Sequence, residues 1–527
     1  MVNDIIRKIM KYEWVLFYLI TLLNLLPAIQ VDFFPSLDGP AHLYNANLIH
    51  ELIFSNSAVL NEFYVFNSEI VPNWGGHFIL AFLYSFFPGV WVNKLFIGIC
   101  LLLLPVSFRF CVKKINKDAV FTTYLIVPFT YTFMFCLGFY NFYIGLIVLF
   151  FTLGILISYR ENKFKISSLI MLFFLINVSY FSHLFVFLSL GMYMFFSCSL
   201  ELIHAFFEKK NMTDLLKKIG GLFFVSIIPL WLSINYFAHS EGNSKSYLLK
   251  TELFQWITNC RSIICYSVED DVFYSTCIFL IIMFLLSVGL YLKGEETKII
   301  PHGKLSFVKS FFLMFTIHDS FIFIAGAFLV LYFKLPDSDL SAGFISVRLN
   351  LMMFLFFIIW ISRFNYPKWI SVIGLTVILS SNFKLLKGHS SVFENLSNEI
   401  TEIMEIEPMI KENSIVLPLN YSNNWLTHHN SNYLGVEKPV VILDNYECNN
   451  SYFPLSWNCD ANMLKLARGG KNKFDEILNN IEKETLNRVN YIFIQNTKEF
   501  PDSLRTKILE NFSLIKATEN YALYEKI

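Results

Sequence analysis

Two carboxylates and a histidine follow the first apolar run of the sequence, between residues 32 and 47. The second carboxylate, Asp38, can take a proton from a hydroxyl group as a general base, because apolar surroundings at a membrane edge tune the pKa of such a group. A structural role is the alternative, since Asp before Gly39-Pro40 is typical of a helix N-cap. Asp32 can simply mark the membrane interface. We therefore take Asp38 as the candidate catalytic residue.

His42 lies four residues after Asp38, so both side chains share one face of a helix. We predict that His42 helps to orient a sugar or a phosphate, although a purely local structural role is equally open. No second group elsewhere has the spacing that a metal site with His42 would need. The sequence also has no Walker loop, no dinucleotide glycine pattern and no zinc spacing. We therefore expect no cofactor and no nucleotide-dependent reaction; a divalent metal is possible, but the sequence does not support one.

Five more polar residues interrupt apolar sequence in three places: Tyr140, Asn141, His183, Asp337 and Arg348. Tyr140 and Asn141 suit sugar recognition, or else form a helix-hairpin turn with interfacial tyrosines. An ionisable residue such as His183 at membrane depth is a functional candidate. Arg348, which follows Asp337, can hold a lipid phosphate or extend toward lipid headgroups. We predict that all five belong to a substrate-binding site.

The elements that position these residues are membrane helices. The 527 residues are 55% hydrophobic and 16% charged, whereas a soluble domain carries about 25% charged residues. Apolar runs of about 18 residues or more recur between residues 14 and 384, which predicts a polytopic helical membrane protein in contact with membrane lipids. Positive and negative charges balance at 41 each, so we expect no nucleic-acid partner. The first run lacks a small-residue cleavage site and should remain as a helix.

Lysines and arginines predict the topology, because they concentrate in cytoplasmic loops. The basic N-terminus should be cytoplasmic, and residues 32–74 form a first outer loop whose residues 39–54 make an amphipathic interfacial helix. Residues 75–111 make either one net crossing or two, and only one net crossing places the later basic loops in the cytoplasm. Further crossings are expected at residues 119–136, 139–158, 167–180, 184–202, 221–238, 272–292, 309–333, 345–361 and 369–383. About eleven crossings result, and all the candidate site residues then lie at the outer face.

The tail from residue 385 has a different composition. Its apolar runs at 414–419, 439–443 and 491–494 are short, and helical patterns at 392–410 and 475–489 lie between them. This predicts a membrane domain over residues 1–384 and a small extracytoplasmic α/β domain over residues 385–527. Two cysteine pairs in outer segments suit an oxidising compartment. The preferred disulfide is Cys448–Cys459, and free thiols are the alternative.

This order of elements resembles the GT-C membrane glycosyltransferases, and the likeness covers most of the chain. It is similar to poorly characterised bacterial members more than to the protein mannosyltransferases or the lipid A aminoarabinose transferases, which often have an acidic pair where this sequence has Asp38-Gly39. The segments that carry the resemblance are Ser36-Leu37-Asp38-Gly39-Pro40-Ala41-His42-Leu43-Tyr44, Val71-Pro72-Asn73-Trp74-Gly75-Gly76-His77, Gly138-Phe139-Tyr140-Asn141-Phe142, Phe181-Ser182-His183 and Arg348.

The resemblance implies an inverting glycosyltransferase of the cytoplasmic (inner) membrane. It would transfer a sugar from a polyprenyl-phosphate carrier to a glycan, lipid or protein acceptor at the outer face. Asp38 would be catalytic and Arg348 would hold the donor phosphate, while the other candidates shape the sugar pocket. The alternative is a lipid or polysaccharide transporter, or an envelope assembly factor, without catalysis. A transporter should carry ionisable residues along the middle of several helices, whereas most polar residues here cluster at one face.

Overall fold

The computed structural model describes residues 12–527 apart from 56, 162–163, 210–211, 240–244, 267, 299–306, 340–342 and 468–482. The basic N-terminal residues and half of the helix expected at 475–489 lie outside the described residues. The chain forms two compact units. The first contains Met1–Pro27, Ile99–Met134 and Phe142–Ser390, and the second contains Ala28–Gly98, Phe135–Asn141 and Ser391–Ile527.

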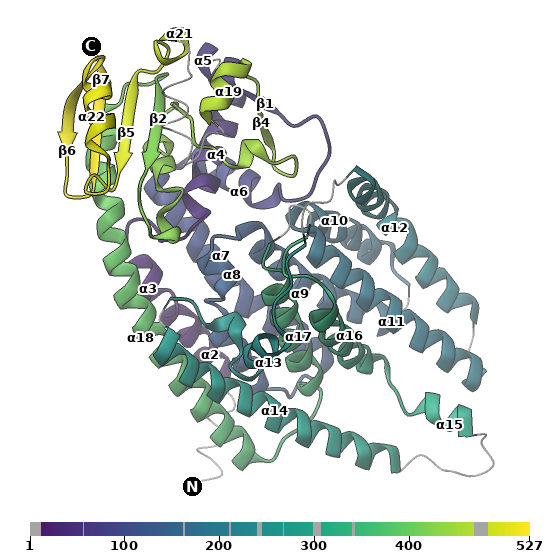
Figure 1. The fold of residues 1–527 in the computed structure, drawn as a ribbon. Helices are drawn as coiled ribbons and strands as arrows, with labels where there is room; N and C mark the ends of the chain where they lie inside the picture. Colours follow the sequence, from purple (N-terminus) through teal and green to yellow (C-terminus); the bar gives the residue numbers. More distant parts are fainter. Residues whose placement is uncertain are drawn as a thin grey trace. The chain divides into compact units, whose positions relative to one another are not determined.

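The first unit is helical, and α7 and α18 each contribute residues to both units (Figure 1). Within the described residues, seven helices are long and apolar enough to cross a membrane, and five apolar helices are shorter. The protein is therefore a multi-pass membrane protein, as predicted. The helices are α2 (Glu13–Leu23), α3 (Leu26–Ile29), α7 (Gly89–Ile115), α9 (Tyr140–Glu161), α10 (Ile166–Ser182), α11 (Leu184–Glu208), α12 (Met212–His239), α13 (Lys250–Thr258), α14 (Val268–Lys298), α15 (Phe307–Leu313), α16 (Ser320–Lys334), α17 (Ile345–Ile361) and α18 (Lys368–Ile406).

The structure agrees with the expectation for residues 75–111 and contradicts the one for residues 119–136. Residues 75–111 form α6 (Gly75–Tyr84) and the start of α7. A ten-residue helix is about 15 Å long and cannot cross a core of about 30 Å, which agrees with one net crossing. The single membrane helix expected at 119–136 is wrong: this segment is the 3₁₀ helix η1 (Phe121–Phe129) followed by α8 (Phe133–Cys136). Pro128 within η1 lacks the backbone N–H that a continuous α-helix needs.

The second unit contains the mixed sheet that the C-terminal composition predicts. Its strand order is β3-β2-β5-β7-β6, with β3, β2 and β5 parallel and β7 and β6 antiparallel. The three parallel strands arise from the three short apolar runs, because strands buried on both faces have continuous apolar sequence. The bounds are β2 (Ile415–Asn420), β3 (Val441–Ile442), β5 (Tyr491–Gln495), β6 (Phe512–Ala517) and β7 (Tyr521–Lys526), with a separate pair β1 (Tyr64–Phe66) and β4 (Leu455–Trp457).

Helix α4 (Gly39–Phe54) has the predicted bounds, but the prediction that it is an amphipathic interfacial helix is wrong. All eleven residues from Gly39 to Ile49 are buried. The hydroxyl of Tyr44 donates to the Val440 carbonyl at 2.8 Å, and the amide of Asn47 donates to the Gly435 carbonyl at 2.9 Å. The C-terminal segment therefore covers α4, together with α6 and the short helix η6 (Asn430–Gly435). Figure 1 shows α4 and α6 side by side.

The cysteines do not pair as expected. The described residues contain no disulfide, so the Cys448–Cys459 bridge is not formed. Cys448 is buried with its sulfur 3.9 Å from Oδ1 of Asn45, whereas Cys459 is partly exposed.

Candidate functional site

A turn at Gly138 supports the backbone of Asp38. The Asp38 N–H donates to the Leu137 carbonyl at 2.9 Å. Gly138 has a φ of +87°, and a Cβ placed on it would lie 2.5 Å from the Gly39 nitrogen and 3.1 Å from the Asp38 carbonyl carbon. Only glycine fits both this conformation and this distance. The turn that carries Tyr140 thus sets the position at which Asp38 enters α4.

Asp38 occupies the N-cap position of α4, yet its side chain makes no capping hydrogen bond. The predicted N-cap position is therefore correct, but the alternative that the Asp38 side chain caps the helix by a hydrogen bond is wrong. The residue is only 8% exposed. Nε2 of His429 lies 3.9 Å from Oδ1 of Asp38. The carboxylate is thus directed toward residues of the C-terminal segment and not toward the helix that it begins.

His429 and Tyr446 form the wall beside Asp38. Their rings stack, with centroids 4.4 Å apart and planes at 25°. Burial, followed by the charge of His428, lowers the pKa of His429 to about 4, so its imidazole is neutral at pH 7. Burial, followed by the negative charge of Asp38, raises the pKa of Tyr446 far above its usual value. Both residues therefore present uncharged hydrogen-bonding groups next to Asp38.

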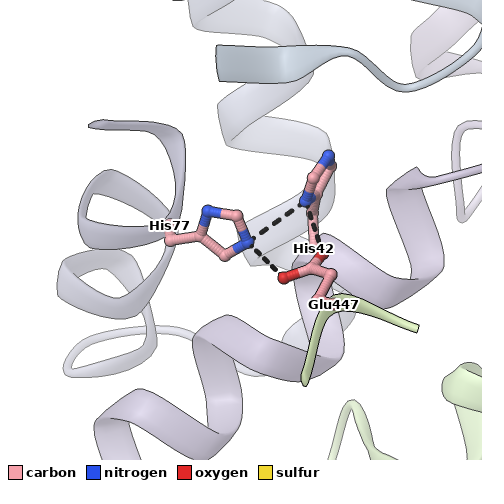
Figure 2. Close-up of side chains that lie close together, drawn as sticks. All are labelled: His42, His77 and Glu447. Carbon is pink, nitrogen blue, oxygen red and sulfur yellow. Dashed lines mark hydrogen bonds and ion pairs between the residues drawn. The ribbon is translucent and has the colours of Figure 1, made fainter. Parts of the chain in front are cut away.

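A second group, which we call the His–His–Glu cluster, consists of His42, His77 and Glu447 (Figure 2). Nδ1 of His42 lies 2.6 Å from Oε1 of Glu447, and Nε2 of His77 lies 2.7 Å from Oε2. The two imidazole nitrogens are 3.1 Å apart. The residues come from α4, α6 and the short helix η7 (Glu447–Asn449), and all three are buried. Two imidazoles and a carboxylate at this spacing can share protons or hold a metal ion.

The histidines determine the charge of Glu447. Burial is the largest influence and opposes ionisation of the carboxyl group, but the charges of His77 and His42 and their hydrogen bonds together hold its pKa at about 2. The ring of Phe453 packs against both imidazoles, with centroid distances of 5.8 Å to His42 and 5.6 Å to His77. Glu447 is therefore a carboxylate enclosed by imidazole and aromatic rings.

Tyr140 and Asn141 lie next to these groups, but both have protein partners. The Tyr140 hydroxyl is 3.0 Å from the Ser36 hydroxyl, and its ring lies 5.6 Å from that of His42. Oδ1 of Asn141 accepts from the Gly76 N–H at 2.7 Å, at the start of α6. These contacts position α4 and α6, and a role for either residue in sugar recognition stays a prediction.

The remaining candidates belong to the first unit. Nδ1 of His183 accepts from the Phe185 N–H at 3.1 Å and begins α11. The guanidinium of Arg348, in α17, is close enough to His183 to interact with it electrostatically. Asp337 accepts from the Ser346 N–H at 3.1 Å and so holds the loop before α17. The structure thus brings Arg348 to His183 within one unit.

His77, His429, Tyr446 and Glu447 were not identified as site residues from the sequence. The sequence held one signal for Tyr446 and Glu447, which is their position shortly after the apolar run that forms β3. Polar residues after parallel strands gather at the carboxyl edge of a sheet. His77 ends one of the segments that carry the family resemblance, but nothing in its spacing distinguishes it. His429 has no local signal at all.

Asp444, near the same edge, provides a pH-dependent test of this part of the fold. Burial raises its pKa to about 6, against the effect of a 3.0 Å hydrogen bond from Ser431. A raised pKa means that folded-state stability is present at low pH and is lost as pH rises through about 6. We expect Asp444→Asn to gain about 1–3 kcal/mol relative to the parent protein between pH 4 and 7.

Apparent melting temperatures of both purified proteins across this range measure the effect. The exposed Asp502→Asn variant is the control and should follow the parent protein at every pH. A constant difference between Asp444→Asn and the parent would contradict the assignment.

No family model matches this sequence, and no curated protein matches it. The crystal structure of ArnT from Cupriavidus metallidurans bound to undecaprenyl phosphate is similar to it, with a TM-score of 0.54. The superposition covers 98% of each chain at 10% sequence identity. The chain therefore has the GT-C fold that its sequence predicts, in an ArnT-like form with a small C-terminal sheet.

Proposed function

We propose that this protein is a membrane glycosyltransferase that moves a sugar from a polyprenyl-phosphate carrier to a cell-envelope acceptor. The main support is a fold shared over 98% of the chain with an enzyme structure that contains undecaprenyl phosphate. The buried Asp38, at the start of the first loop helix, adds a group suited to the chemistry. The shared fold does not favour the transporter alternative.

The proposed reaction is a single displacement with inversion. The acceptor hydroxyl oxygen attacks the anomeric carbon of the sugar while Asp38 takes the hydroxyl proton. The bond between the anomeric carbon and the phosphate oxygen breaks, and the polyprenyl phosphate leaves with the electron pair. His429 and Tyr446 lie beside the carboxylate and are uncharged at neutral pH, so they can orient sugar hydroxyls by hydrogen bonds.

In this proposal Arg348 holds the donor phosphate, and His183 supports it. Arginine forms paired hydrogen bonds to phosphate oxygens, which are stronger than neutral ones. The protein would lie in the cytoplasmic membrane with its N-terminus inside and the C-terminal sheet outside, which places Asp38 at the outer face. In this orientation the protein would bind lipid-linked sugars on the side of the membrane where envelope acceptors lie.

Transfer by the purified protein tests the proposal. Reconstituted protein is incubated with a panel of radiolabelled polyprenyl-phosphate sugars and with envelope fractions as acceptors. We expect label to move from one donor to an acceptor, with release of polyprenyl phosphate. If none of the donors is used or bound by the folded protein, the proposed function is wrong.

Substitution of Arg348 should act on donor binding. Because a hydrogen bond to a charged group contributes about 1.5–3 kcal/mol, we expect Arg348→Ala to raise the donor KM by about 10- to 100-fold. Arg348→Lys keeps the charge without the paired hydrogen bonds, so its donor KM should lie between those of the parent protein and Arg348→Ala. Steady-state kinetics with varied donor measure this, and Arg505→Ala in α22 (Asp502–Leu509) is the control. An unchanged KM in Arg348→Ala would remove Arg348 from the donor site.

A further inference from the structure

We propose that the His–His–Glu cluster is a binding site for one divalent cation of the zinc class, held by Nδ1 of His42, Nε2 of His77 and the carboxylate of Glu447. No spacing in the sequence supports a metal site, and the proposed site does not depend on the proposed glycosyl transfer. Metal binding is measured directly below, so it can succeed or fail whatever the outcome of the transfer assay.

The geometry is close to what a zinc ion requires. Ligand atoms around tetrahedral zinc, at about 2.0–2.1 Å from the ion, are about 3.3 Å from one another. The two imidazole nitrogens are 3.1 Å apart, and the carboxylate oxygens lie 2.6 and 2.7 Å from them. Increases of about 0.2 to 0.7 Å in these separations would thus open the cluster to its ion. Three protein ligands also leave one position for water or substrate, as in zinc sites that take part in catalysis.

Proton sharing alone leaves this cluster incompletely satisfied. The two imidazole nitrogens face each other at 3.1 Å, and only one proton fits between them. Nδ1 of His42 lies 2.6 Å from the buried Oε1 of Glu447, but among the described residues no hydrogen bond of good angle reaches this oxygen. A buried carboxylate oxygen without a donor costs free energy. A cation between the three groups would be bound by both imidazole lone pairs and by this oxygen.

A backbone carbonyl beside His77 can accept from the tautomer that metal binding needs. Its Nδ1 lies 3.2 Å from the Asn73 carbonyl oxygen, to which an Nδ1–H can donate. A ligating histidine commonly donates its second N–H to a carbonyl in this way, which leaves the lone pair on the other nitrogen for the metal. The Asn141 amide nitrogen lies 3.3 Å from the same Nδ1 and can donate to it only in the other tautomer, so metal binding would exchange this contact for the one to Asn73. The His77 ring is thus fixed with Nε2 directed at Glu447.

The donor atoms select the type of metal. Calcium and magnesium prefer six or more oxygen ligands, or several retained waters, whereas imidazole nitrogen suits zinc and its neighbours among the transition metals. A buried site with two imidazoles and one carboxylate therefore favours zinc over magnesium. The charge also fits, because a carboxylate ligand neutralises part of the charge of a divalent cation.

Such an ion would join three elements that are distant in sequence. His42 lies in α4, one turn after Asp38, and Glu447 directly follows Tyr446. A metal bond between them would fix the distance between Asp38 and the His429–Tyr446 wall. His42, His77 and Glu447 are therefore positioning residues for the candidate site, and not groups that we place on the reacting atoms.

Metal content is the first test. Protein purified without chelator or nickel resin, and loaded with zinc before desalting, should contain about one zinc per chain by elemental analysis. His77→Ala and Glu447→Gln should contain less than about one tenth of that. His50→Ala is the matched control, because His50 also lies in α4 but belongs to no such group among the described residues. Zinc retained in both cluster variants, or absent from the loaded parent protein, would overturn the proposal.

Cobalt substitution keeps the test independent of variants that fail to fold. The parent protein, titrated with Co²⁺, should develop visible absorption bands of a four-coordinate site with nitrogen and oxygen ligands, and one equivalent of Zn²⁺ should remove them. Co²⁺ that gives only the weak spectrum of the hydrated ion would show that the cluster binds no metal. If His50→Ala keeps the Co²⁺ spectrum and folded His77→Ala loses it, His77 is assigned as a metal ligand.

Discussion

Asp38→Asn is expected to lower sugar transfer by about 10²- to 10⁴-fold while donor affinity stays within about twofold, because asparagine has the shape of aspartate but cannot take a proton. The buried position of Asp38 favours a clean result, since the amide occupies the same space as the carboxylate and can keep its contact with His429. Initial transfer rates of the reconstituted variant measure the loss of transfer, and lipid-binding assays measure its donor affinity. A variant with full activity would rule out Asp38 as the base.

The matched control lies in the same loop. The side chain of Asp32 is 71% exposed and pairs with Lys94 at 2.8 Å. Exposed ion pairs contribute about 0–1 kcal/mol, so Asp32→Asn should keep both transfer and stability. A loss of transfer in Asp32→Asn equal to that in Asp38→Asn would point to the charge of the whole loop and not to one carboxylate.

Gly138→Ala is expected to reduce transfer by more than about tenfold through the backbone of Asp38, without touching its side chain. A residue other than glycine at positive φ costs about 1 kcal/mol or more. The added Cβ would also lie 2.5 Å from the Gly39 nitrogen, so the turn and the start of α4 must move apart. We expect a lower kcat together with a lower apparent melting temperature, both measured on the purified variant.

Gly98→Ala controls for the substitution itself. Gly98 lies within α7, and a Cβ placed there meets no atom within 4 Å. Alanine stabilises a helix relative to glycine by about 0.5–1 kcal/mol, so this variant should be as active and at least as stable as the parent protein. Wild-type rates in Gly138→Ala would show that the turn does not hold Asp38 in place.

The sequence was informative where a pattern is local. Apolar runs identify the membrane helices, Gly39-Pro40 begins α4 where predicted, and three short apolar runs become the parallel strands. It failed where the deciding contact is remote. Helix α4 appeared amphipathic because its cover, including Gly435 and Val440, lies almost 400 residues later. The segment at 119–136 failed for a different reason, since its composition is that of a helix but Pro128 interrupts the hydrogen bonding.

The same distinction between local and remote contacts explains which residues of the candidate site could be predicted from the sequence. Asp38 and His42 are recognised because one turn of one helix contains both. Glu447 completes the cluster from the other end of the chain, so no local spacing between metal ligands exists to be found. Residues that meet only through tertiary structure carry no sequence pattern of their own.

The burial of α4 by the C-terminal segment also sets an order of events during synthesis. Asn47 and its partner Gly435 are separated by 388 residues, which a ribosome needs about 20–80 s to add. Throughout that interval the eleven buried residues of α4 can pack against α6 but lack the cover of the C-terminal segment. Asp38 meets His429 and Tyr446 only when translation is nearly complete. Under the proposed function, the surroundings of Asp38 are therefore complete only after the C-terminal segment has been made.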